Sequence, residues 1–229
     1  MKKVNYISLA ALILIAASST AYADGFAGPY AGVEAGYVTG QDKGTETFNG
    51  AINGWTENIK PDGGVLGIFG GYNWMVAPQF LMGVEADFEG RSQYKTNNLS
   101  LNGVPQSTDL IKTDVRYAAS LRLRAGYVFN MDSTLAYVTA GYAGVDIERT
   151  FTNTIPPLTT NSVTSWENGW TVGVGAERFF TPRVTGRFEY RYSKYGEKAV
   201  SAAGAFGPGI AEHMKYDDNT LQLGIAYHF

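Results

Sequence analysis

Residues 114–129, which read DVRYAASLRLRAGYVF, decide the fold of this chain. Successive side chains of a β-strand point to opposite faces, so apolar residues spaced two apart predict a strand with one apolar and one polar face. The apolar face holds Val115, Tyr117, Ala119, Leu121, Leu123, Ala125, Tyr127 and Phe129. The other face holds Asp114, Arg116, Ser120, Arg122 and Arg124.

Two tyrosines give this strand a length scale. Tyr117 and Tyr127 lie ten positions apart on the apolar face. At ~3.3 Å per residue and a tilt of ~40°, they are separated by ~25 Å along a membrane normal. That distance is the height of the apolar band between the aromatic girdles of a transmembrane barrel, so the segment predicts a strand that crosses a membrane.

Seven further segments repeat the pattern. It is clear in residues 80–91, 184–195 and 220–229, and weaker in residues 30–38, 64–74, 135–148 and 169–180. Three connections are short and carry turn residues, namely 75–79, 130–134 and 181–183. Four are long and polar, namely 39–63, 92–113, 150–168 and 196–218. This alternation predicts an all-β, eight-stranded antiparallel up-and-down transmembrane barrel with four long extracellular loops and three short periplasmic turns.

The first residues indicate export. Lys2 and Lys3 precede an apolar run over residues 7–17 and a small-residue stretch over 18–23, the order of a secretory signal peptide. The apolar run is shorter than the ~20 residues that a membrane-spanning helix needs. We therefore expect residues 1–23 to be a cleaved signal peptide and residues 24–229 to form one barrel domain, which reaches the outer membrane of a Gram-negative cell through the periplasm.

Composition narrows the class further. Aromatic residues make up 14% of the chain, there are 28 glycines and no cysteine, and the formal net charge is −3. A modest acidic excess argues against a nucleic-acid partner. Without disulfides, packing and backbone pairing must hold the fold. Only helices and closed barrels satisfy every backbone group in lipid, so a membrane protein without apolar helices is expected to be a barrel.

Several short motifs resemble the small outer-membrane β-barrel family. They are GFAGPYAGVEAGY at residues 25–37, GIFGGYNW at 67–74, GVEADF at 83–88, AGY at 125–127, GWTVGVGAE at 169–177 and EYRY at 189–192. The resemblance is closest to the porin-like major surface proteins of α-proteobacteria, some of whose relatives bind haemin. The last strand, with Tyr227 and a terminal Phe229, is similar to the signal read by the outer-membrane assembly machinery. The resemblance therefore implies this machinery, membrane lipid and lipopolysaccharide as partners.

The polar faces of the predicted strands define a lumen set of both charge signs. Its members are Glu34, Glu85, Asp87, Glu89, Arg116, Arg122, Arg124, Asp146, Glu148, Glu177, Arg187, Glu189 and Arg191. These residues could line a pore or fill the lumen as packed ion pairs. An eight-stranded barrel has an interior just wide enough for side chains, which favours the packed network.

The chain offers little for catalysis. Its two histidines, His213 and His228, are expected near opposite ends of the barrel, and no spacing of nucleophile, base and carboxylate accompanies them. We therefore expect no enzyme activity, no metal site and no resident cofactor. Because of the family resemblance, His213, with Met214 and Tyr216, is a candidate haem ligand, and a solvated loop histidine is the alternative.

The predicted loops carry aromatic residues that could brace the loops, touch lipopolysaccharide or anchor protein partners. They are Phe48, Trp55, Phe151, Trp166 and Phe206. The sequence thus predicts a structural surface barrel that supports envelope integrity and presents its loops to a host or other extracellular ligand. The alternatives are a narrow porin for small solutes or ions, and haemin capture by the loops. A soluble lipocalin-like barrel would place its charges outward, which the aromatic girdles oppose.

Overall fold

The structure, a computed structural model, describes residues 25–129, 133–201 and 206–229. The predicted signal peptide lies outside the described residues. The described chain forms ten strands. They are β1 (Gly28–Phe48), β2 (Ala51–Ile59), β3 (Asp62–Ala77), β4 (Phe80–Leu101), β5 (Val104–Phe129), β6 (Thr134–Asn153), β7 (Thr159–Thr181), β8 (Val184–Tyr195), β9 (Lys198–Ser201) and β10 (Ile210–His228).

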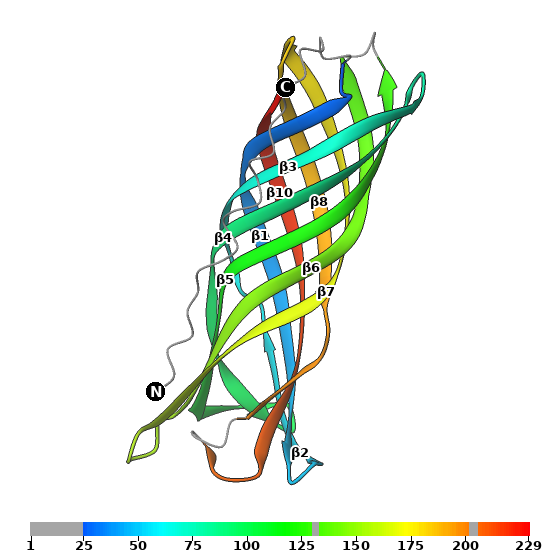
Figure 1. The fold of residues 1–229 in the computed structure, drawn as a ribbon. Coiled ribbons are helices and arrows are strands. Elements are labelled where there is room, and N and C mark those ends of the chain that lie inside the picture. The colour runs from blue at the N-terminus through cyan, green and yellow to red at the C-terminus, as the bar shows by residue number, and fades with distance from the viewer. Residues whose placement is uncertain (1–24, 130–132, 202–205) are drawn as a thin grey trace, which may run out of the picture.

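Eight of these strands close into an antiparallel ring (Figure 1). The order around the ring is β1, β3, β4, β5, β6, β7, β8 and β10, and β10 pairs with β1 from Tyr30↔His228 to Phe48↔Ile210. In the membrane-spanning part, closure leaves no strand edge unpaired, as a wall inside lipid requires. The predicted eight-stranded up-and-down barrel is confirmed.

The long connections differ from the prediction because most of their residues are strand. The predicted loop over residues 92–113 is almost wholly the ends of β4 and β5, joined by a two-residue turn at Asn102 and Gly103. Asn49 and Gly50 likewise join β1 to β2. All four turn residues have positive φ, between 49° and 84°, the conformation of a tight hairpin turn that Asn-Gly favours. These Asn-Gly pairs were the sequence signal for hairpins in place of loops.

The extended hairpins carry the barrel wall beyond the membrane. β2 pairs with the end of β1 and touches β4, while β9 pairs with β10, so both strands continue the wall. We call this part the extracellular tier. It consists of β2, β9 and residues 42–48, 93–101, 104–115, 147–153, 159–167 and 210–216, and it lies at the β2 end of the barrel in Figure 1.

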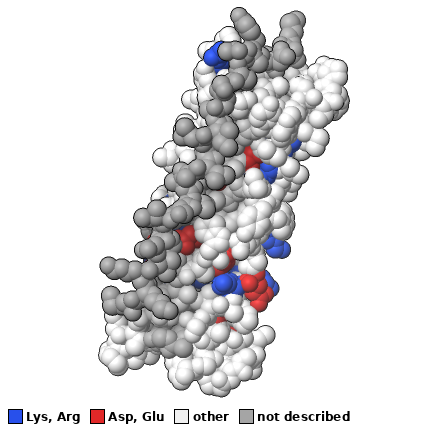
Figure 2. Space-filling view, in the orientation of Figure 1, with Lys and Arg blue, Asp and Glu red and all other residues white. Residues whose placement is uncertain are grey.

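Between the tier and the short turns at the other end, the outer surface of the ring is apolar. Leu66, Leu121 and Leu123 are 61–68% exposed, although leucine is normally buried in a soluble protein. Figure 2 shows a largely uncharged surface on the uncovered part of this face, with the largest group of charged side chains in its lower half. Among the described residues, no helix is long and apolar enough to cross a membrane. A band of exposed apolar side chains around a closed ring of strands is the lipid-facing surface of a transmembrane β-barrel.

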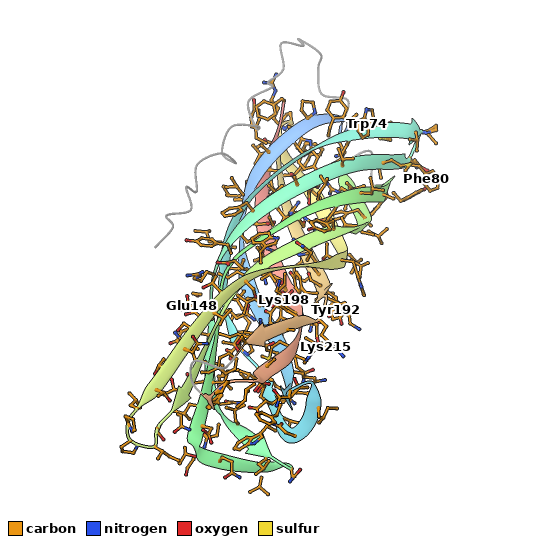
Figure 3. All side chains as sticks on the ribbon, turned by 60° about the horizontal axis from the view of Figure 1, so that its bottom comes forward. Trp74, Phe80, Glu148, Tyr192, Lys198 and Lys215 are labelled. Atoms are coloured by element: carbon orange, nitrogen blue, oxygen red, sulfur yellow. The ribbon has the colours of Figure 1, made fainter. Side chains whose placement is uncertain are left out.

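Aromatic hydroxyls mark both borders of this band. Toward the extracellular tier, Tyr142 donates a hydrogen bond to Asn168 and Tyr190 donates one to Asn219, each at 2.5 Å. At the opposite rim, Tyr127 donates to Gln79 at 2.6 Å, close to the turn that joins β3 to β4. Figure 3 shows Trp74 and Phe80 at this second rim and Glu148 toward the tier. Rings with an apolar body and a polar tip suit such interfaces.

Candidate functional site

The lumen of the membrane-spanning part is filled by ion pairs centred on Arg122. Its guanidinium contacts Glu85 at 2.5 Å, Asp87 at 3.2 Å and Glu189, so one cation joins two acidic strands across the barrel. Arg187 contacts the same Glu85 at 2.7 Å and Glu34 at 2.5 Å. These side chains are at most 1% exposed, so water has almost no access to them.

Three more arginines extend the network along the barrel axis. Arg124 pairs with Glu177 near the periplasmic end. Toward the tier, Arg191 pairs with Glu89 and Asp87, and Arg91 contacts Glu89 at 2.9 Å. Ten of the predicted lumen residues thus belong to one buried network: Glu34, Glu85, Asp87, Glu89, Arg122, Arg124, Glu177, Arg187, Glu189 and Arg191.

Sequence reasoning missed Arg91 and Asp218, which join the same network. Arg91 contacts Asp218 at 2.7 Å, and both side chains are at most 1% exposed. Arg91 ends the predicted strand over residues 80–91, where its alternation with Glu89 was a usable signal. Asp218 was assigned to a loop. Only the structure, in which β10 begins at Ile210, shows that Asp218 lies in a strand and points inward.

Arg116 is a correction, because it lies outside the network. Its side chain is 40% exposed and contacts Asp146 at 2.8 Å and Glu148 at 3.0 Å on the outer wall. The register between β5 and β6 shifts between Val115 and Tyr117, a β-bulge that reverses the alternation of β5. Val115 therefore points inward and is fully buried, opposite to the prediction. Asp146 and Glu148 were also assigned inward and are outward.

The histidines occupy opposite ends of β10. His213 is partly exposed on the outer wall, where its Nδ1 lies 2.9 Å from Glu197. Its neighbours Met214 and Tyr216 are buried on the inner face, so these three candidate haem ligands do not converge on one iron. His228 is buried at the periplasmic end, with Nε2 3.1 Å from Glu177. Nearby, the rings of Tyr227 and Phe229 pack at 5.1 Å on the outer face.

The extracellular tier has an interior of its own. An apolar cluster of Ile59, Leu99, Ile111, Phe151, Val200 and Met214 lies inside the wall, with Trp55, Phe206 and Ile210 packed against it. Beside the cluster is a cavity of about 250 Å³. Its lining residues are Glu46, Trp55, Leu99, Asp109, Asn153, Phe206 and Ile210. We call the cavity with the inward carboxylates around it the tier chamber.

The tier chamber is rich in buried carboxylates. Six of them are at most 9% exposed, whereas Arg149 is the one buried cation among the described residues of the tier. The carboxylates belong to Asp42, Glu46, Glu57, Asp109, Glu167 and Glu212. Arg149 contacts Asp42 at 2.9 Å and Glu167 at 2.5 Å, so it compensates only the deeper acids. Sequence reasoning missed this group because it lies in segments assigned to loops.

Comparison with known proteins agrees with this architecture. Residues 7–229 match the model of the outer membrane protein beta-barrel domain. The chain belongs to the outer-membrane β-barrel family. Within this family, it is similar to the 25 kDa outer-membrane immunogenic protein of Brucella abortus, with 32% identity over 80% of this chain and 73% of that protein. It is also similar to the 22 kDa outer membrane protein of Rhizobium leguminosarum, with 34% identity over 71% of this chain and 64% of that protein.

Solved structures of outer-membrane barrels share the fold. OprG from Pseudomonas aeruginosa superposes with a TM-score of 0.58 at 16% identity, over 89% of this chain and 96% of that chain. The protease OmpT from Escherichia coli gives a TM-score of 0.54 at 12% identity, over 88% and 97%. Identity this low shows a common fold and carries no activity across. The curated relatives are named as outer-membrane proteins and not as enzymes.

Proposed function

We propose that the protein is a structural barrel of the outer membrane that supports envelope integrity and presents its hairpins to extracellular partners. The observation that best supports this proposal is the filled lumen. Arg122, Arg187 and the carboxylates between them are at most 1% exposed and occupy the space that a solute would need. A barrel without a water path acts through its walls and its exposed ends.

The hairpin ends supply the surface for partners. Ile52 is 75% exposed, Leu158 67% and Val104 61%, and each lies at the tip of a hairpin of the tier. Exposed apolar side chains at such tips are typical of binding surfaces. The immunogenic relatives in Brucella are consistent with a family whose hairpins face the outside. Lipopolysaccharide at the aromatic border and the assembly machinery at Tyr227 and Phe229 are further partners in this proposal.

Planar-bilayer recording tests the closed lumen. We expect the purified wild-type protein to insert without steady single-channel conductance, because the ion pairs exclude water from the barrel axis. The narrow-porin alternative requires steady conductance that changes when Arg122 or Arg187 is replaced. Reproducible wild-type conductance would contradict the filled lumen.

Deletion of the gene tests the structural role separately. The proposal expects deleted cells to become more sensitive to detergent, and a plasmid copy lacking only residues 154–158 at one hairpin tip to restore resistance. Those five residues lie beyond the ends of β6 and β7, so their removal costs the wall only the pair Asn153 and Thr159, which forms the new two-residue turn. Unchanged detergent sensitivity in the deletion strain would argue against a role in envelope integrity.

A further inference from the structure

The strongest unexplained feature of the molecule is the pair of acids Glu57 and Glu212 in the tier chamber. Glu212 is fully buried and Glu57 is 5% exposed, yet neither carboxyl group has a cationic partner among the described residues, and the side chain that Glu212 contacts is another carboxyl group, that of Glu46. An unpaired buried carboxylate is strongly destabilising unless it is neutralised or bound by a cation. No arginine of the lumen network pairs with either of these two acids, because all of those arginines pair with other carboxylates.

The pairing of the strands places Glu57 and Glu212 close to a third acid, Glu46. Glu212 on β10 is the direct cross-strand partner of Glu46 on β1, and both face inward. Glu57 on β2 pairs across from Gly44, two positions before Glu46. A Cβ built on Gly44 would lie 1.6 Å from a Glu57 oxygen, so the carboxyl group of Glu57 lies directly over this glycine and would have to move if a side chain were added there. Glu57 and Glu212 therefore lie in the wall of the tier close to Glu46, which lines the cavity.

The walls of the chamber are apolar and aromatic. Glu46 lines the cavity together with Trp55, Leu99 and Phe206. Met214 borders Glu57 on the other side, with its Sδ also close to Gly44. The lysines of the tier are exposed or half-exposed, as for Lys198 and Lys215, which Figure 3 labels on the neighbouring strands β9 and β10. Around Glu46, Glu57 and Glu212, the chamber therefore combines carboxyl groups that have no cationic partner among the described residues with a surface suited to an apolar body.

We propose that the tier chamber is a binding site for a small organic cation with an apolar body, such as an aromatic ammonium compound. The ammonium group lies against Glu46, with Glu57 and Glu212 next to Glu46 in the wall, and the apolar body lies against Trp55, Leu99 and Phe206. Aromatic faces attract cations and also bury hydrocarbon, so both parts of such a ligand find partners. A cavity of about 250 Å³ suits a compound with a single ring.

The protonation of the chamber supports this proposal. Burial, and then the negative charge of Asp42, raises the pKa of Glu57 to about 8, against a smaller opposing effect of Arg149. Burial, and then Glu57 and Glu46, raises the pKa of Glu212 to about 10. Without a ligand, both acids are therefore largely protonated at pH 7. A bound cation favours their ionised form, so its binding releases protons.

Calorimetric titration of the purified protein in detergent micelles tests the proposal, with benzyltrimethylammonium as the probe and benzyl alcohol as its neutral comparison. The probe carries a permanent charge, so any released protons come from the protein. We expect saturable binding of the probe, at least tenfold tighter than benzyl alcohol. We also expect net proton release at pH 7, measured as a heat that differs between buffers of different ionisation enthalpy.

Matched variants place the site. Glu57→Gln combined with Glu212→Gln keeps the shape of both side chains but removes their ability to ionise. The double variant should therefore bind the probe at least tenfold more weakly and release no protons. Glu197→Gln changes an exposed acid next to β9, outside the chamber, and should leave both the affinity and the proton release unchanged. Equal affinity for probe and alcohol, no binding of the probe, or unchanged affinity in the double variant would each overturn the proposal. The comparison of probe and alcohol on wild type decides the question even if the double variant fails to fold.

Discussion

Arg122 shows how single residues hold the lumen. It contacts Glu85, Asp87 and Glu189, while Glu85 is shared with Arg187, so the charges at the centre of the network are shared between several partners. Removing one member leaves several charges in a space that water does not enter. Removing an exposed member of an ion pair has a much smaller effect because water solvates the remaining group.

The replacement Arg122→Ala should therefore lower the free energy of unfolding by ~3–5 kcal/mol, the cost of leaving buried carboxylates without their cation. Arg116→Ala is the matched control, because Arg116 also contacts two carboxylates but is 40% exposed. We expect it to cost less than ~1 kcal/mol. Urea unfolding of the protein in lipid vesicles measures both. Similar losses for the two variants would mean that the lumen is well hydrated.

At the scale of elements, alternation predicted the faces of β5 correctly only on the C-terminal side of its bulge. From Tyr117 to Phe129 the odd-numbered residues, all of them apolar or aromatic, face lipid, and Ser120, Arg122 and Arg124 face the lumen, as the sequence indicates. On the N-terminal side of Tyr117, the extra residue Arg116 reverses the two faces of the strand, so Val115 points inward. A bulge arises from the pairing of β5 with its neighbours, and the sequence of one strand does not reveal it.

Single cysteines test this reversal, and the chain is suited to them because it has no native cysteine. With a membrane-impermeant maleimide on intact cells, Arg116→Cys should react and Val115→Cys should not. A lipid-soluble maleimide should label Leu121→Cys and leave Arg122→Cys unlabelled. Reaction at position 115 but not at 116 would show that the alternation continues without a bulge.

At the scale of the whole molecule, ring closure decides the behaviour of the protein. The wall is continuous because β1 and β10 pair over nineteen positions, from Tyr30 to Phe48. Its outer face is apolar and its inner face is charged, the reverse of a soluble barrel. The same wall continues as the extracellular tier, so the tier chamber exists only in the closed molecule.

Gel electrophoresis tests this closed state. We expect unboiled protein in SDS to migrate differently from boiled protein, because the closed ring of backbone hydrogen bonds resists the detergent until it is heated. We also expect the protein to need detergent to stay in solution. Identical mobility of both samples, together with solubility in plain buffer, would contradict the transmembrane barrel.

The sequence by itself determined the eight membrane strands, their order and which face meets lipid, because alternation and turn residues are local properties. The local pattern alone therefore assigns residues such as Leu121, Arg122 and Glu189 to a face. The tertiary structure alone decided the outward position of Arg116, the continuation of the loops as strands and the convergence of Glu46, Glu57 and Glu212. These features depend on register between strands far apart in the chain, which no local pattern encodes.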